Sequence, residues 1–153
     1  QREVMTFTGD MIARVGSDIQ VDGAKFAVII VPSYWQVHDH YVDELRNQKE
    51  GDIELLLPNN IVRNRLKENQ LLLDLSRPVA EALNVEKKEI FINDVGHFTV
   101  YGHELAAREI GKFIQEEADQ LGLRFAKAGY SSSSARLLYL GKVSLSPFIY
   151  ALF

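Results

Sequence analysis

The run from Phe26 to Val31 constrains the fold more than any other part of the sequence. It is continuous, apolar and largely β-branched, and Pro32 ends it. Such a run is typical of a strand buried on both faces of a parallel sheet, because a strand with one solvated face alternates apolar and polar residues. Parallel strands need crossover connections, which are usually helices. The sequence therefore predicts an α/β domain with a mainly parallel sheet flanked by helices.

Helical and extended patterns alternate around this strand. Residues 3–15 show helical spacing of apolar residues and predict an amphipathic helix with a packed apolar side, which the polar run 16–24 ends. The apolar positions are Val4, Met5, Met11, Ile12 and Val15. Further helices are predicted over residues 40–50, 58–69, 76–84 and 99–120, with Ser76 and Thr99 as N-caps, and extended segments over 71–75 and 89–92. In such a fold, reactive groups lie in loops at the carboxyl ends of strands.

Composition narrows the classes of function. The 153 residues are 46% hydrophobic and 25% charged, which suits one globular domain. The formal charge is -4 and lysine and arginine form no block, so nucleic acid is not an expected partner. The chain has no cysteine, which excludes disulfides, thiolate metal sites and cysteine nucleophiles. The compartment stays open between cytoplasmic and exported, because no signal peptide pattern is visible and many exported proteins also lack cysteine.

The C-terminal part has a different character. Ser131–Ser134 form a low-complexity run that we interpret as a flexible linker, and Leu137–Phe153 is rich in apolar residues. Glycine, lysine and proline interrupt this apolar segment, which is shorter than the about 20 residues of a membrane-spanning helix. We therefore expect one domain over residues 1–129, a linker and tail of unknown role over 130–153, and no membrane span.

Asp94 and His97 are the candidate acid–base pair. They lie in a polar loop with Gly96 between them, just before the predicted helix 99–120. This spacing allows the Asp94 carboxylate to accept a hydrogen bond from the Nδ1–H of His97, which leaves Nε2 free to take a proton from a nucleophilic hydroxyl. A loop aspartate that caps a turn beside an exposed histidine is the competing interpretation from spacing alone.

The block from Phe91 to Ile110 resembles the last signature block of the SGNH/GDSL hydrolases. In that family an Asp-x-x-His pair is followed by a threonine or similar residue, a glycine, commonly a histidine, and an alanine-containing helix. The matching positions here are Asp94, His97, Thr99, Gly102, His103 and Ala106. Upstream, Phe26–Pro32 looks like the family's late strand ended by proline, and Asn59–Leu75 resembles its helix and short strand ending in Asp-Leu. The resemblance covers roughly residues 3–115.

The resemblance implies a flavodoxin-like SGNH sandwich and an ester hydrolase or related acyl-transfer enzyme that needs no cofactor or metal. Asp94 and His97 would be catalytic, on an ester substrate such as an acylated carbohydrate or lipid. The family's Gly-Asp-Ser motif and the asparagine of its Gly-x-Asn-Asp motif are not found in order, and Gly9-Asp10-Met11 has methionine where serine is required. We therefore expect a chain that lacks the family's N-terminal strands, with the serine in a missing segment and little activity alone. The alternative is a non-catalytic α/β binding or interaction domain.

Other polar and aromatic residues are weaker candidates for the functional site. By the resemblance, Tyr34, Trp35 and His38 lie near the substrate entrance, although Trp35 equally suits core packing. Ser33 follows the best strand but is more typical of a helix cap than of a nucleophile. A metal site is suggested by His38, Asp39 and His40, but residues two apart diverge on a helix and no further ligand follows at a helical spacing. We interpret His103 as a packing residue.

The resemblance also has a consequence for assembly. Without the family's opening strands, Phe26–Val31 becomes an edge strand whose apolar run suits a central position. We therefore expect a homo-oligomer through this exposed sheet edge, unless the tail covers it.

Overall fold

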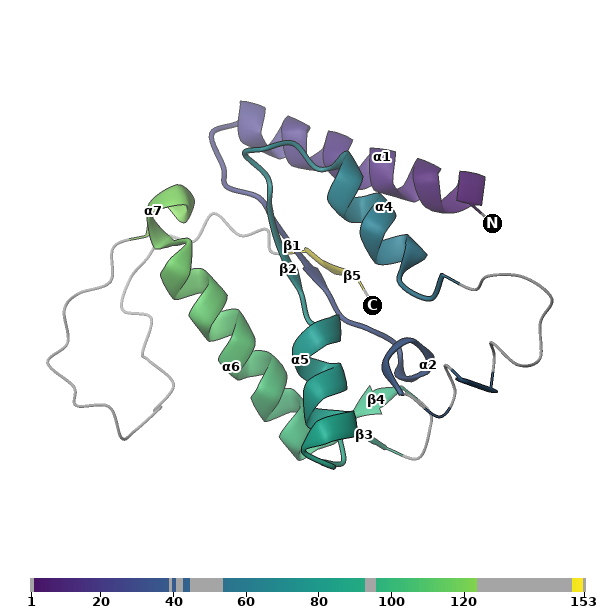
Figure 1. Ribbon diagram of the computed structural model, residues 1–153. Coiled ribbons are helices and arrows are strands. Elements are labelled where there is room, and N and C mark those ends of the chain that lie inside the picture. Colours follow the sequence, from purple (N-terminus) through teal and green to yellow (C-terminus); the bar gives the residue numbers. More distant parts are fainter. Residues whose placement is uncertain are drawn as a thin grey trace, which may run out of the picture.

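The computed structural model describes residues 2–38, 40, 43–44, 54–92, 96–123 and 150–152 (Figure 1). In chain order its elements are α1 (Arg2–Val21), β1 (Ala27–Ile30), α2 (Tyr34–Val37), α4 (Leu57–Arg65), β2 (Leu71–Asp74), α5 (Ser76–Ala80), the π-helical turn η1 (Glu81–Val85), β3 (Phe91–Ile92), β4 (His97–Phe98), α6 (Val100–Glu116), α7 (Ala118–Leu121) and β5 (Tyr150–Leu152).

Strand β1 is the centre of a small parallel sheet with the strand order β2-β1-β5. Ala27 lies opposite Leu71 on one side, and Val28 lies opposite Tyr150 on the other. Ala27, Val28 and Ile29 are buried, as predicted for a strand covered on both faces. Because residues 150–152 pair with β1, the exposed edge expected on this strand is covered by the tail and does not offer an oligomer contact.

Helices lie on both sides of this sheet. Figure 1 shows α1 and α4 on one side and α5 and α6 on the other. The larger core lies on the α5 and α6 side, where Leu75, Val79 and Ile90 are fully buried. Each such side chain stabilises the fold by about 1.5–3 kcal/mol relative to an exposed one. The predicted α/β class with a parallel sheet is confirmed at this level.

Helix α1 differs from its prediction in two ways. It continues through Gly16 to Val21 instead of ending near residue 15. Gly16 does not end the helix but allows it to pack closely on Phe26, since a Cβ at this position would lie 2.5 Å from the Phe26 ring. The packed face is made of Gly9, Ala13 and Gly16, whereas Val4, Met11 and Val15, which were expected to be packed, are exposed.

Several other boundaries shift. Helix α4 ends at Arg65 because Leu66 turns extended, with ψ 143°, so the predicted helix 58–69 is shorter. Ser76 lies in the first turn of α5 and is not its N-cap; its N–H donates to Asp74 Oδ1 at 2.9 Å. The predicted helix 40–50 falls largely outside the described residues, and the predicted domain boundary at 129–130 falls entirely outside them.

The predicted polar loop 94–98 is partly a β-hairpin. Strands β3 and β4 pair antiparallel, with Phe91 opposite Phe98 and Ile92 opposite His97. Thr99 then caps α6 as predicted, since its Oγ1 accepts the N–H of Gly102 at 3.1 Å. The helix ends at Glu116, and the short α7 takes up the rest of the predicted range.

Candidate functional site

The β3–β4 hairpin carries the candidate acid–base residues. His97 is the first residue of β4, and its side chain is exposed. Gly96 before it has φ +80°, a left-handed conformation that glycine adopts without steric cost. Asp94 lies outside the described residues, so its contact with His97 stays a prediction. The antiparallel pair of β3 and β4 thus presents His97 to solvent.

The hairpin is anchored from below by aromatic packing. The rings of Phe91 and Phe98 lie 5.3 Å apart between centroids, and Tyr34 of α2 meets Phe91 edge-on at 5.3 Å. Such aromatic pairs contribute about 0.5–1.5 kcal/mol beyond the area that they bury. Because Tyr34 follows β1 in the chain, these contacts hold the hairpin at the carboxyl end of the parallel sheet.

Backbone contacts fix the same hairpin to helix α6. The N–H of Thr99 donates to Ile90 O at 2.9 Å, and Thr99 Oγ1 donates to Glu89 O at 2.6 Å. Gly102 lies so close to Ile90 O that an added Cβ would collide with this carbonyl. These contacts tie the chain after His97 to Ile90 before β3, while the His97 side chain is exposed.

The three predicted substrate residues have different environments. Tyr34 is buried at 8% exposure, and it shares a hollow of about 280 Å³ with His38, whose ring centroid lies 4.9 Å from its own. Trp35 is 46% exposed and meets Tyr34 edge-on at 5.8 Å, so the core-packing alternative for this indole is wrong. Phe91 also lines the hollow, which places it beside the hairpin, but neither Trp35 nor His97 lines it.

A polar network at the carboxyl ends of β1 and β2 was not expected from the sequence. Its centre is Asn59 of α4, which is buried at 3% exposure. The Nδ2 of Asn59 donates to both carboxylate oxygens of Asp74 at 3.2 Å and to Ser76 Oγ at 2.8 Å. Its Oδ1 accepts from Gln36 Nε2 at 3.2 Å. One buried amide thus joins α2, α4, β2 and α5.

Asp74 is the only carboxylate of this network. It accepts hydrogen bonds from Arg63 Nη2 at 3.0 Å and from the N–H of Ser76 at 2.9 Å, besides those from Asn59. Charge-assisted hydrogen bonds of this kind are stronger than neutral ones. Each of these donors bonds Asp74, and Asn59 bonds Ser76 as well, so the network serves to brace the loops after β1 and β2. The sequence signal for it is an aspartate that interrupts the apolar run 71–75.

The serine and metal candidates are not brought into a reactive arrangement. The N–H and the hydroxyl of Ser33 both donate to Gln36 Oε1, at 2.9 and 3.1 Å, as in a helix cap. The rings of His38 and His40 lie 6.4 Å apart, and Asp39 lies outside the described residues. Within those residues, no group of three or more histidine and carboxylate side chains is placed to hold a metal ion. His103 is exposed on α6, with its ring edge-on to Phe98 at 5.8 Å.

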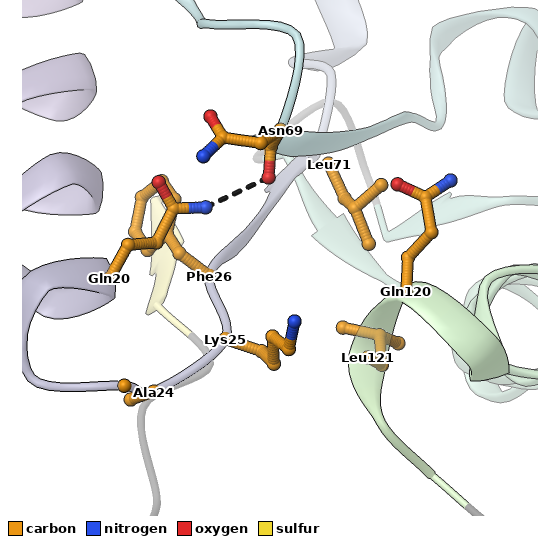
Figure 2. Close-up of a pocket in the computed structure, with 9 residues that line it drawn as sticks. Gln20, Ala24, Lys25, Phe26, Asn69, Leu71, Gln120 and Leu121 are labelled. Carbon is orange, nitrogen blue, oxygen red and sulfur yellow. Dashed lines mark hydrogen bonds between the residues drawn. The ribbon is translucent and has the colours of Figure 1, made fainter.

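A second hollow lies at the opposite end of the sheet (Figure 2). It measures about 400 Å³ and is lined by the segment before β1, the turn before β2 and helix α7. Lys25 is the one ionisable residue that lines it, and Gln20 Nε2 donates there to Asn69 O at 2.8 Å. Without a candidate base or nucleophile, this larger hollow is a poorer place for chemistry than the hairpin end.

Comparison of the chain with models of protein families, with curated proteins and with solved structures finds no match. None of the helices in the described part of the chain is both long and apolar enough to cross a membrane.

Proposed function

We propose that this chain carries the acid–base part of an SGNH-type ester hydrolase or acyl-transfer site. In this proposal Asp94 orients His97, and a serine outside these 153 residues is the nucleophile. One observation carries the proposal: His97 presents an exposed imidazole from β4, whose C-terminal end is fixed by the hydrogen bond from the Thr99 N–H to Ile90 O. A general base must reach solvent or substrate while its ring stays oriented, and this placement satisfies the first requirement.

The position of the hairpin supports the same proposal. Strands β1 and β2 are parallel, so their carboxyl ends lie at one edge of the sheet. Tyr34 and the hairpin meet at that edge, where α/β folds hold their reactive groups. We propose on this ground that the parallel sheet with helices on both sides belongs to a flavodoxin-like SGNH sandwich.

The proposed reaction uses His97 as a proton carrier. The serine oxygen attacks the ester carbonyl carbon and passes its proton to His97 Nε2, and the leaving alcohol takes this proton as its C–O bond breaks. Water or another alcohol then cleaves the acyl-serine by the same route, which gives hydrolysis or transfer. The Asp94 carboxylate would accept a hydrogen bond from Nδ1–H throughout, with the proton remaining on the ring, and so stabilise the transient imidazolium.

The surface around α2 supports a proposal for the substrate class. Trp35 exposes nearly half of its area while Tyr34 supports its ring from below. An exposed, supported indole suits the apolar face of a sugar ring or an acyl chain. We therefore propose an acylated carbohydrate or lipid ester as substrate, with Trp35 at the rim of the site and Tyr34 and His38 in the adjoining hollow.

The Asp94–His97 contact is testable in this chain by imidazole ¹H–¹⁵N NMR, which identifies the ring nitrogen that carries the proton. At alkaline pH we expect the Nδ1–H tautomer for His97, and the Nε2–H tautomer in Asp94→Ala. His103 serves as the internal control, because its tautomer should not respond to that substitution. An Nε2–H tautomer of His97 in the unmodified chain would contradict the proposal and favour a non-catalytic α/β domain.

The location of the nucleophile is tested separately by hydrolysis of p-nitrophenyl acetate. We expect the chain alone to hydrolyse this ester no faster than its His97→Ala variant. A robust rate that disappears in His97→Ala would instead place the nucleophile within the chain. Fluorophosphonate labelling would then identify it, and Ser33 would be the first serine to check.

A further inference from the structure

Helix α1 carries an exposed stripe of large apolar residues. Val4, Phe7, Met11 and Val15 are exposed at 69%, 63%, 50% and 41%. Their spacing of three, four and four residues places them on one face of the helix. Isolated exposed apolar residues are ordinary on protein surfaces, but a continuous stripe marks a surface that another group covers. We call these four residues the α1 stripe.

The stripe faces away from the rest of the domain. The opposite face of α1 packs through small residues on α4 and on Phe26, just before β1, and a Cβ at Gly9 would lie 3.1 Å from Ile61 Cγ2. Figure 1 shows α1 at the periphery, with α4 between it and α5. The small residues bring α1 close to its neighbours, and the large residues are therefore left on the outer face.

The charges beside the stripe argue against a lipid surface. Helix α1 contains three acidic residues, Glu3, Asp10 and Asp18, against two basic ones, Arg2 and Arg14, and the acidic Asp22 directly follows its last residue. Helices that lie on membranes are rich in lysine and arginine, because biological surfaces are anionic. An acidic amphipathic helix fits a protein partner better.

Two of these charged residues, Glu3 and Arg14, allow the α1 stripe of one copy to pair with the α1 stripe of a second copy. Asp10 and Arg2 form ion pairs with Arg65 and Glu54 of the same chain. Glu3 and Arg14 lie on one flank of the stripe and have no ion-pair partner within the described residues. In an antiparallel helix pair the same flanks face each other across the two-fold axis. Glu3 of each copy then lies beside Arg14 of the other.

We propose that the α1 stripe is the contact through which two copies of this chain associate, with their α1 helices antiparallel. Val4 of one copy packs against Val15 of the other, and Phe7 packs near Met11. With a rise of 1.5 Å per residue, this register leaves Glu3 and Arg14 offset by only about 3 Å along the helix axis. Each of the two apolar pairings and the Glu3–Arg14 ion pair thus forms twice by symmetry, which gives four apolar layers and two ion pairs.

The size of the stripe fits a modest dimer. Its four side chains expose on the order of 400 Å², about half of the roughly 800 Å² that each partner buries in a standard interface. Flanking residues of α1 would supply the rest. We therefore expect a reversible dimer whose population depends on protein concentration.

Sedimentation velocity over low micromolar to near millimolar concentrations tests the dimer. We expect a monomer–dimer equilibrium for the unmodified chain, and a Kd raised by about 100-fold in Met11→Glu. Val85→Glu is the matched control, because Val85 is 75% exposed and lies in η1, away from the stripe. Circular dichroism checks that each variant is folded. A monomer at every concentration, or a dimer that survives Met11→Glu, would overturn the proposal.

A charge exchange tests the antiparallel orientation. Arg14→Glu places acidic side chains beside Glu3 of the other copy and should raise the Kd by about tenfold. Adding Glu3→Arg to the same chain should return the Kd to within about threefold of the unmodified value. If the double variant stays as weak as Arg14→Glu alone, the two charges do not face each other and the proposed arrangement is wrong.

Discussion

The side-chain amide of Asn59 donates a hydrogen bond to the hydroxyl of Ser76 at 2.8 Å, in the interior of the protein. This contact joins α4 to the first turn of α5 at the point where β2 ends. The same amide group also donates to Asp74, so removal of one side chain affects three elements at once.

The first prediction concerns this amide. Asn59→Ala removes the donor to the buried Ser76 hydroxyl, while Gln36 Nε2 keeps its bond to Leu55 O, and a buried polar group that loses its hydrogen bond costs about 1–3 kcal/mol. We expect the free energy of unfolding, measured by urea titration, to fall by about 2–3 kcal/mol. Asn64→Ala is the control, because Asn64 is exposed on the same helix; its effect should stay below about 0.5 kcal/mol. Equal losses in both variants would contradict the bracing role.

The features that could be predicted from the sequence depend on local rules. The β-branched run 26–31, the apolar run 71–75 and the Thr99 cap each act through neighbouring residues, and the structure has all three. The Asn59 network could not be predicted in this way, because its partners lie 15 to 23 residues away in the chain. Only the folded sheet brings these polar side chains together.

Hydrophobic periodicity predicted helix α1 but not its orientation. Periodicity assumes that large apolar residues face the core. In α1 the core face is Gly9, Ala13 and Gly16, which allow close approach and add little to a hydrophobic pattern. The same limit applies to Trp35 at the candidate site. Its large apolar ring suggests core packing, although nearly half of the residue is exposed.

The second prediction concerns the close approach of α6 to the hairpin. Gly102→Ala forces a methyl group against the carbonyl of Ile90, which belongs to the backbone and cannot rotate away. We expect a loss of about 1–3 kcal/mol in the free energy of unfolding. Gly111→Ala on the same helix meets no atom within 4 Å and should stabilise the protein by about 0.5–1 kcal/mol, because alanine favours helix. Thermal melting of the two variants should therefore shift in opposite directions, and a shift in the same direction would contradict the packing.

The third prediction concerns pH. The hydrogen bond from Lys112 Nζ, at 3.0 Å, lowers the pKa of Glu109 below its ordinary value of 4.5, and Arg108 contributes less. A carboxyl with a depressed folded-state pKa stabilises the protein above pH 4.5, and this contribution is lost as the pH falls through the folded-state pKa. Lys112→Met should raise the pKa of Glu109 toward 4.5 in a carboxyl NMR titration, whereas Lys67→Met should leave it unchanged. The stability involved is below about 0.5 kcal/mol, because the Lys112 side chain is 56% exposed and solvent screens the pair.

The fourth prediction concerns the hairpin that presents His97. Phe91 and Ile92 are neighbours on β3, yet Phe91 is 8% exposed and Ile92 is 46% exposed. Phe91→Ala removes the ring that Tyr34 and Phe98 both contact and should cost about 3–5 kcal/mol, whereas Ile92→Ala should cost less than about 1 kcal/mol.

Hydrogen exchange distinguishes loss of the hairpin from loss of the whole fold. The Thr99 N–H donates to Ile90 O. It should exchange faster in Phe91→Ala, because Ile90 directly precedes β3 and moves when that strand loosens. The β1 amides that pair with β2 should lose protection only by as much as global stability falls. If Thr99 and β1 lost protection equally, Phe91 would support the whole core, and His97 would owe its fixed position to the sheet and not to the aromatic anchor.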